Sequence, residues 1–334
     1  MGSGADPTVY RVRRRSCSRP VLGFVLALVF GGALAQPYPS RPIRIVAPFP
    51  ASGGVDLSAR VIGQKLAERL GTTVVVDNRP GAGGILGTDI VAKAPADGYT
   101  LLLASGSHAI NPALHHKLPY DAVRDFAPVA LVVTAPSILT VTPSLGVRTM
   151  KYFLALARAK AGQLPFASPG TGTPPHLAIE LLKSAANVDF THIPYKGAAE
   201  FLPDLMAGRV SAGISAVPTV LSLVQAEKLY PLGVTTKVRS RALPAVPTIS
   251  EGGVPGYEAA TWYALLAPAS TPQAVLDRLN QEVVQIVRTD DVRERLARQG
   301  LETTGSSRQE LGTLIRQDIV KWQKVVKTAG IKPE

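Results

Sequence analysis

The chain alternates strand-like and helix-like segments, and a glycine-rich turn stands at each of the first two strand-to-helix junctions. β-Branched and apolar residues mark strands at residues 43–47 and 73–76, and helical patterns follow at residues 56–70 and 85–94. A third strand pattern covers residues 99–104. Alternating strands and helices of this length predict parallel βαβ units, which constrains the chain to an α/β fold.

The alternation resumes near residue 150 and predicts a second domain. The expected helices cover residues 150–161, 174–185, 200–207 and 220–228. The expected strands of this block lie near residues 138–141, 165–167, 190–193, 211–215 and 230–235, whereas the strands expected near 129–134 and 262–266 belong to the first block. This second block has the same βα character as the first, so each block is expected to form its own sheet.

Two amphipathic helical patterns end the chain and are expected to pack on the first sheet. Ser307 and Glu310 form a capping box at the start of the last one. Because the chain then crosses twice between the two blocks, we predict a discontinuous first domain of residues 36–138 and 261–334. Residues 139–260 form the predicted second domain, and a cleft is expected between the two.

The two glycine-rich turns are candidate anion sites. We call residues 48–54, PFPASGG, the first glycine turn and residues 77–84, DNRPGAGG, the second glycine turn. A helix start leaves N–H groups unpaired and carries partial positive charge, and glycine lets a ligand approach the backbone. Both turns follow strands of one parallel sheet, so both are expected to face one crevice. The alternative for either turn alone is glycine that only tightens the connection. Asp56 is interpreted as the N-cap of the first helix.

A third turn, in the second block, offers similar donors. Residues 168–173, which we call the threonine turn, end in Thr171, Gly172 and Thr173 directly before a helical pattern. Thr173 is expected to cap this helix, with Pro174 at its first position. Facing the glycine turns across a cleft, the threonine turn would complete a cage of neutral donors suited to a carboxylate.

Several other chemistries lack the residues that they require. Gly81, Gly83 and Gly87 are spaced one residue too widely for a dinucleotide fingerprint, and the next strand leads to Ser105 rather than to an acid. The sequence contains no Walker lysine, no G-x-S-x-G elbow and no zinc-binding histidine spacing. His176 is interpreted as a capping or packing residue. We therefore expect no enzyme, no cofactor and no metal site.

The beginning of the chain predicts export. Four arginines within residues 11–15 precede an apolar run at residues 21–34, and Ala-Leu-Ala ends at residue 35, as in a secretory signal peptide. A membrane anchor is the alternative, but the run is shorter than the roughly 20 residues that span a bilayer. Residues 1–35 hold the only cysteine, five arginines and one aspartate, so without them the net charge falls from +12 to +8. Basic clusters interleaved with aromatic residues are absent, so no nucleic-acid partner is expected.

Several stretches together resemble one family. PFPASGGVDLSAR, DNRPGAGGILGTDIVAKAPADGYTLLLAS, TGTPPHLAIELLK and HIPYKGAAEFLPDLMAGRV resemble the Bug family of periplasmic solute receptors, the extracytoplasmic component of tripartite tricarboxylate transporters. The resemblance implies a two-domain type II periplasmic-binding-protein fold that closes on a small organic carboxylate. It also implies a membrane permease as partner, a periplasmic location and a monomeric receptor.

The resemblance also implies which residues bind the ligand. They come from the three turns, from the end of the third strand and from a later helix: Phe49, Pro50, Ala51, Ser52, Gly53, Gly54, Asp56, Gly81, Ala82, Gly83, Gly84, Ser105, Ser107, Thr171, Gly172, Thr173, His176 and Asp204. The implied contacts are backbone amides of the glycine turns, while second-domain residues select the rest of the ligand.

Three departures from the family pattern leave the ligand open. Ser52 stands where the family usually has glycine, Thr173 replaces the commoner serine, and Glu200 with its neighbours replaces Ala-Pro-Ala. A glutamate there repels an acidic group or pairs with an amine, so a dicarboxylate or tricarboxylate, an amino acid and an aromatic acid all stay possible. A ligand sensor that feeds a two-component system and a secreted α/β enzyme that acts on organic acids are the alternatives to a transport receptor.

Overall fold

Contacts divide the chain into the units Met1–Gln36 and Pro37–Glu334. The computed structural model describes residues 1, 4, 38–51 and 53–333. Nearly all of the first unit, including most of the predicted signal segment, therefore lies outside the described residues, as does Ser52 in the second unit. Among the helices that are described, none has the length and apolar character needed to cross a membrane.

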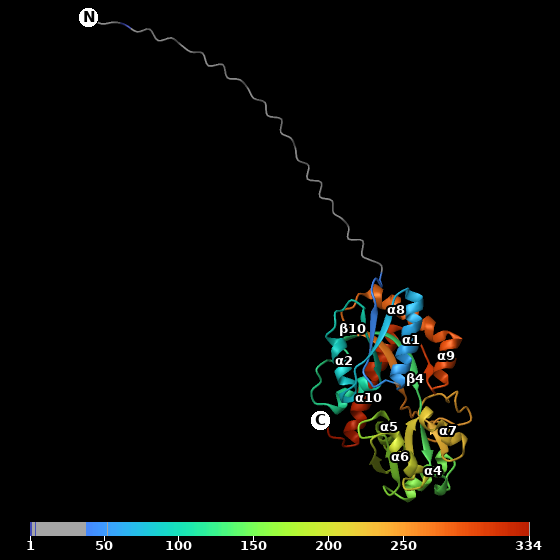
Figure 1. The fold of residues 1–334 in the computed structure, drawn as a ribbon. Helices are drawn as coiled ribbons and strands as arrows, with labels where there is room; N and C mark the ends of the chain where they lie inside the picture. The colour runs from blue at the N-terminus through green and yellow to red at the C-terminus, as the bar shows by residue number, and fades with distance from the viewer. Residues whose placement is uncertain (2–3, 5–37, 52, 334) are drawn as a thin grey trace. The chain divides into compact units, whose positions relative to one another are not determined.

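The first lobe is built on a six-stranded sheet (Figure 1). Its strands in spatial order are β11 (Glu302–Thr303), β4 (Phe126–Ala135), β10 (Thr261–Pro268), β3 (Thr100–Ser105), β1 (Ile43–Ala47) and β2 (Val74–Asn78). β1 pairs in parallel with β2 and β3, whereas β10 pairs antiparallel with β3 and β4. The helices of this lobe are α1 (Gly54–Leu70), α2 (Ile85–Ala92), α3 (Ser107–Leu114), α8 (Gln273–Arg288), α9 (Asp290–Ala297) and α10 (Arg308–Thr328).

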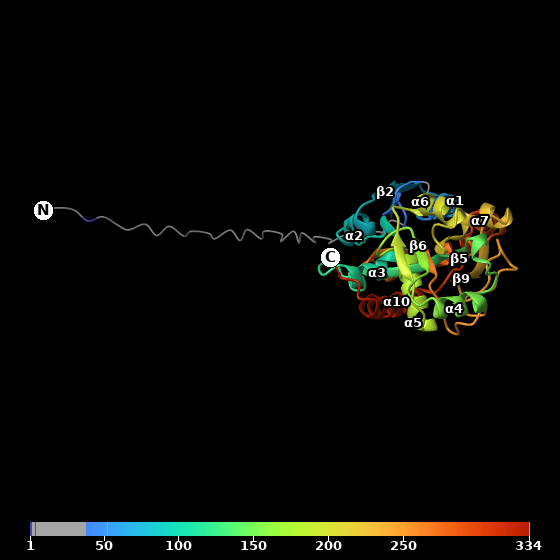
Figure 2. The same cartoon turned by 90° about the horizontal axis from the view of Figure 1, so that it is seen from below.

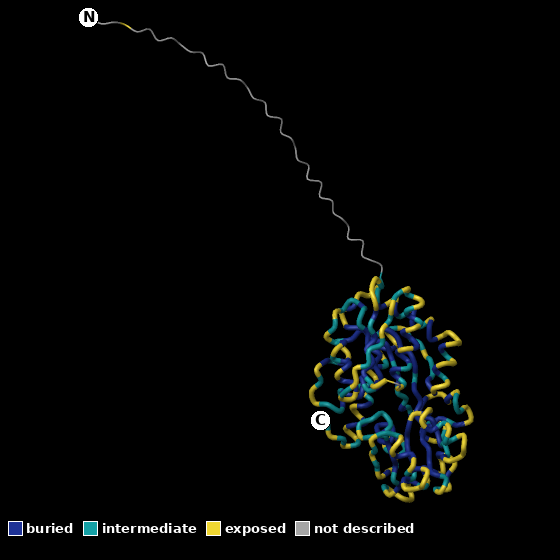
Figure 3. Tube along the Cα trace, viewed as in Figure 1, coloured by how far each residue is buried: buried dark blue, intermediate teal, exposed yellow. Residues whose placement is uncertain are grey.

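Side-chain alternation along β1 divides the core of the first lobe between two faces of the sheet. Ile43 and Ile45 are buried in a cluster with residues of α1, α8 and α9. Val46 belongs to a second cluster that contains residues of α2, α3 and α10. Buried residues accordingly follow the strands in Figure 3. Full burial of a side chain of this size stabilises the fold by roughly 1.5–3 kcal/mol. The packed core therefore holds the strand ends, from which the turns leave, in fixed positions.

The second lobe is built on a five-stranded sheet. Its strands in spatial order are β7 (Thr191–Pro194), β6 (Pro165–Ser168), β8 (Ala212–Ala216), β5 (Ser137–Val141) and β9 (Tyr230–Val234). β6 pairs in parallel with β7 and β8, and β5 pairs antiparallel with β8 and β9. The helices are α4 (Met150–Ala159), α5 (Pro174–Ala186), α6 (Ala198–Met206) and α7 (Val217–Gln225). Two short 3-10 helices, η1 (Ala82–Gly84) and η2 (Pro143–Leu145), complete the described helices.

Two chain crossings and helix α10 connect the lobes. β4 leads into β5 through Pro136, and the chain returns to the first sheet before β10. α10 contacts α3 of the first lobe and α5 of the second, beside which it lies in Figure 2. The indole Nε1 of Trp262 in β10 donates to Asp318 Oδ2 of α10 (2.7 Å), and Trp322 shares a buried cluster with Leu177 of α5. α10 is thus fixed to both lobes.

The structure differs from the sequence prediction at several elements. α3 and α9 were not predicted, because α3 is short and contains Pro112, while α9 starts at Asp290 directly after α8 ends. Three helices rather than two therefore follow β10. β2 continues to Asn78, so the second glycine turn is shorter than expected. The predicted domain boundaries stay a prediction.

The predicted N-cap of α1 is wrong. Gly53 occupies the cap position, and Asp56 lies in the first turn of the helix. Asp56 is buried and pairs with Arg60, four residues later (3.0 Å). A carboxylate within the first turn still interacts favourably with the positive end of the helix. The sequence therefore predicted correctly that an acidic residue lies near the start of α1, but Asp56 lies in the first turn and not at the cap.

Candidate functional site

The two glycine turns leave the same edge of the first sheet. β1 and β2 pair in parallel and in register as far as Ala47 opposite Asn78, so the strands end side by side. The backbone N–H of Arg79 donates to the carbonyl of Ala47 (2.8 Å). Asn78 Nδ2 donates to the carbonyl of Phe49 (3.1 Å). These bonds hold the beginnings of the two turns together, as expected for neighbouring parallel strands.

The second glycine turn has an unusual backbone. Four consecutive residues have positive φ: Gly81 (141°), Ala82 (47°), Gly83 (63°) and Gly84 (93°). Only glycine adopts such angles without strain, which explains three of the four residue types. A Cβ at Gly84 would lie 3.2 Å from the ring of Phe49, so the first glycine turn packs closely on the second. The carbonyl of Gly83 accepts a bond from Asn111 Nδ2 of α3 (3.3 Å).

Residues of both lobes line a cavity of about 320 Å³. Six predicted ligand-binding residues line it: Phe49, Gly83, Ser107, Thr171, Gly172 and Thr173. Six further residues do so without having been predicted: Asn111, Leu114, His115, Pro174, Ile331 and Lys332. The cavity thus brings together one residue of each glycine turn, one face of α3, the threonine turn and the segment after α10.

The unpredicted residues had only weak signals in the sequence. Ser107, Asn111 and Leu114 recur at helical spacing and share one face of α3, so recognition of that helix would have found the last two. Pro174 was predicted as the first residue of α5 but not as a wall of the site. Ile331 and Lys332 follow α10, and no local pattern relates them to the glycine turns.

The other predicted residues lie outside the lining of this cavity. Pro50, Ala51 and Gly53 are exposed in the first glycine turn, Gly54 packs against Tyr263, and Ser105 is buried at the end of β3. Asp56 is paired with Arg60, as described above. Gly81, Ala82 and Gly84 shape the second glycine turn without lining the cavity. Their roles in ligand binding stay a prediction.

Side chains hold the threonine turn in place. Thr173 Oγ1 donates to the carbonyl of Gly170 (2.7 Å) and accepts the N–H of His176 (3.4 Å), which confirms it as the N-cap of α5. The N–H of Gly172 donates to His176 Nδ1 (3.0 Å). The N–H of Gly170 donates to Ser168 Oγ (3.2 Å). His176 therefore supports the turn from behind, as the packing role predicted.

A second histidine extends this support. The rings of His176 and His192 stack with centroids 4.0 Å apart, and His192 Nε2 lies 2.7 Å from Ser168 Oγ. Burial, together with the nearby His192 and Lys183, lowers the pKa of His176 to about 4. Burial and Lys183 likewise lower the pKa of His192 to about 4. Both rings are neutral at pH 7, so the 3.8 Å approach of His176 Nε2 to Glu180 is a polar contact rather than an ion pair.

The predicted Asp204 of α6 is engaged away from the cavity lining. Its carboxylate accepts a bond from the Tyr195 hydroxyl (2.8 Å) and pairs with Arg209 (2.7 Å). The bond from Tyr195 and the cation of Arg209 lower the pKa of Asp204. Glu200, the departure noted in the sequence, accepts the N–H of Lys196 (3.0 Å) at the start of the same helix. Neither acid lines the cavity.

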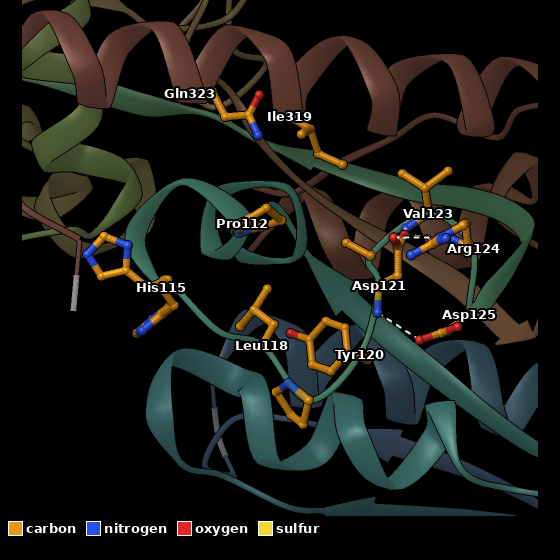
Figure 4. A pocket seen from close by; sticks show the side chains of 13 residues that line it. Pro112, His115, Leu118, Tyr120, Asp121, Val123, Arg124, Asp125, Ile319 and Gln323 are labelled. Carbon is orange, nitrogen blue, oxygen red and sulfur yellow. Dashed lines mark hydrogen bonds and ion pairs between the residues drawn. The ribbon is translucent and has the colours of Figure 1, made fainter.

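A larger cavity, of about 640 Å³, lies in the first lobe alone (Figure 4). It is formed by the end of α3, the segment at residues 115–125 and α10. Its acidic residues bond within their own turn: Asp125 accepts the N–H of Asp121 (2.7 Å), and Asp121 pairs with Arg124 (2.8 Å). Because no residue of the second lobe lines this cavity, the smaller cavity between the lobes is the better candidate for a site that responds to a ligand.

Comparison with known sequences places the chain among solute receptors. The signature of the family described as "Tripartite tricarboxylate transporter family receptor" matches residues 58–331. The "UPF0065 protein in tcbD-tcbE intergenic region" of Pseudomonas sp. (strain P51) is 41% identical over 98% of this chain and 97% of that protein. "Protein BugT" of Bordetella pertussis is 36% identical over 89% of this chain and 92% of that protein.

Solved structures show the same architecture. "R. palustris Rpa4515 with adipate" is 37% identical, with a TM-score of 0.75 over 89% of this chain and 100% of the other. "MatC (Rpa3494) from Rhodopseudomonas palustris with bound malate" is 30% identical, with a TM-score of 0.70 over 86% of this chain and 100% of the other. These similarities confirm the predicted α/β, two-domain binding-protein fold.

Proposed function

Because this chain belongs to the tripartite tricarboxylate transporter family of receptors, we propose that it binds a small organic carboxylate and delivers it to a membrane permease of that transporter type. The family and its structural neighbours are solute-binding receptors and not enzymes, as the sequence predicted. The family description implies that the receptor delivers the bound acid to a permease.

The observation that carries the proposal is the joint lining of one cavity by both lobes. Gly83 and Ser107 line it from the first lobe, and Thr171, Gly172 and Thr173 line it from the second. Hydroxyls such as those of Ser107 and Thr171 are donors that a carboxylate accepts without a buried counter-charge. The Gly172 N–H and the Thr173 hydroxyl already bond within the threonine turn. A ligand that touches both lobes stabilises the closed arrangement more than the open one, which makes closure selective.

The size and charge of the site agree with a small acid. The cavity volume of about 320 Å³ lies at the lower end of the range for small-molecule sites, roughly 300–1,000 Å³. The solved relatives named with adipate and with malate carry ligands of this class. The positive net charge of the chain also favours the approach of an anion.

The proposal includes the location and organisation of the receptor. Residues 1–35 act as the export signal, and the receptor works as a monomer in the periplasm. The two lobes act as the domains predicted from the sequence, residues 36–138 with 261–334 and residues 139–260. The three turns and the other residues inferred from the family resemblance make up the ligand site.

Thermal unfolding of the receptor purified from the periplasm tests the proposal. Adipate, malate, an amino acid and benzoate are added separately at millimolar concentration. A ligand present at 100 times its Kd stabilises the folded state by about 2.7 kcal/mol, which raises Tm by roughly 5–10 °C. Native mass spectrometry then counts the bound acid. No shift with any carboxylate, or chemical conversion of the acid, contradicts the proposal.

A further inference from the structure

Lys332 is a cation in a cavity whose other walls are nearly neutral. Of the described residues that line the cavity, it alone carries a permanent charge, and His115 is the other titratable one. Within the described part of the chain, no acidic side chain pairs with Lys332. Its charge is therefore available to a ligand that enters between the lobes.

The chain reversal after α10 gives Lys332 its position. Gly330 has a positive φ (64°), and its N–H donates to the carbonyl of Lys327 (3.3 Å). The N–H of Ile331 donates to the carbonyl of Val326 (3.1 Å). These two bonds form a Schellman motif, and Ile331 packs on the hydrophobic cluster shared by the lobes. Lys332 thus follows an anchored turn rather than a free end of the helix.

Helix α10 is itself held in place beside the cavity. The bond from Trp262 to Asp318 fixes it to the first sheet, and its contacts with α3 and α5 join it to both walls. The position of residue 332 therefore depends on the same contacts that connect the lobes.

We propose that Lys332 binds a second anionic group of the ligand and makes the receptor prefer dicarboxylates over monocarboxylates. This inference rests on the proposed function. One carboxylate binds the neutral donors of the glycine and threonine turns, and the other accepts a charge-assisted hydrogen bond from Lys332 Nζ. Because Lys332 is exposed, its contribution is that of a partly screened ion pair and weakens with added salt.

The test measures two acids of equal chain length against one substitution. Adipate and hexanoate differ in a single carboxylate, and their Kd values are measured by calorimetry with the exported wild-type protein and the Lys332→Gln variant. We expect wild type to prefer adipate, and Lys332→Gln to weaken adipate about five-fold while hexanoate changes less than about two-fold. Succinate with butyrate gives a second matched pair if the site favours shorter acids.

The control removes an equal charge from the last turn of α10. Lys327 is exposed near the end of α10 and does not line the cavity, so Lys327→Gln is expected to leave both affinities unchanged. Equal binding of adipate by wild type and Lys332→Gln, or equal losses for both acids, overturns the inference and leaves the proposed function intact. If the wild-type protein binds no carboxylate at all, the proposed function and this inference both fail.

Discussion

The second glycine turn and the threonine turn face one cavity but are held by different means. Positive backbone φ at four consecutive residues shapes the glycine turn. Side-chain bonds from Ser168, Thr173 and His176 hold the threonine turn. The second glycine turn is therefore expected to be sensitive to added side chains and insensitive to pH, and the threonine turn to show the opposite behaviour.

The two turns differ in which kind of substitution destabilises them. A turn built from glycines leaves its peptide groups accessible to a ligand. Replacing one of these glycines by another residue costs roughly 1 kcal/mol, because the new side chain is strained at positive φ. A turn held by side chains depends on buried acceptors, and an N–H left without its acceptor costs about 1–3 kcal/mol. Substitutions in the two turns separate these mechanisms.

The largest effect is expected for a side chain added at Gly83. Gly83 is exposed and lines the cavity, and a Cβ there lies 3.5 Å from Asn111 Oδ1. Gly83→Leu places a side chain in or beside the ligand volume and disfavours the backbone at φ 63°. We expect the affinity for adipate to fall on the order of 100-fold and the ligand-induced rise in Tm to disappear.

Gly71 offers a matched control for this substitution. It has the same φ of 63° at the C-cap of α1, and nothing lies within 4 Å of an added Cβ. Gly71→Leu therefore carries the same backbone strain outside the cavity, and we expect a similar loss of stability, about 1 kcal/mol, with normal affinity. Equal affinities of the two variants would show that the second glycine turn does not contact the ligand.

Removal of the acceptor behind the threonine turn is expected to have the next largest effect. His176→Phe keeps a ring of similar shape against His192 but leaves the N–H of Gly172 without its partner. We expect affinity to fall about ten-fold, since the unpaired N–H costs about 1–2 kcal/mol. His176→Gln restores an acceptor and is expected to recover part of the loss in calorimetry. The positioning role is contradicted if His176→Gln binds no better than His176→Phe, or if His176→Phe binds as tightly as wild type.

Acid is expected to weaken the threonine turn and spare the glycine turn. The pKa values of His176 and His192 are each lowered to about 4 in the folded state, whereas unfolded histidine titrates near 6.5. Between pH 6.5 and 4 the unfolded chain binds more protons, so the free energy of unfolding falls as pH falls, by up to about 1.4 kcal/mol per pH unit for the buried His176 and by less for the partly exposed His192, where solvent screens the charge. This loss is complete below pH 4.

Ligand affinity reports the same titration at the cavity. Protonation of His176 at Nδ1 replaces an acceptor with a donor and breaks the bond to Gly172. Glu180 beside the ring favours the protonated form, while Lys183 and His192 oppose it. We expect wild-type affinity to fall a few-fold between pH 6.5 and 3.5, and His176→Gln to show a smaller change. Because both proteins meet the same acid, titration of the ligand cancels in this comparison. Identical pH profiles would exclude His176 as the titrating group.

The contrast between the turns also explains what the sequence could predict. The second glycine turn was found because a backbone with positive φ requires particular residues at the site itself, and residues 81–84 show that requirement directly. The support of the threonine turn by His192 comes from β7, a separate strand, and leaves no local pattern. Lys332 was still harder to predict from the sequence, since its position depends on the packing of α10 on both lobes. Contacts between distant elements therefore account for most of what the sequence did not predict.

The smallest effect is expected at the cap shared by the threonine turn and α5. Thr173→Ser keeps the hydroxyl that bonds Gly170 and the N–H of His176, so stability and affinity are expected to change little. Thr173→Ala removes both bonds and is expected to cost about 1 kcal/mol of stability and to weaken adipate about three-fold. Ser307→Ala is the control, because Ser307 caps α10 through the N–H of Glu310 (3.2 Å) away from the cavity. It is expected to lose similar stability in urea unfolding while binding normally. If Thr173→Ala also binds normally, the threonine turn is only a helix cap, and the second lobe must contact the ligand elsewhere.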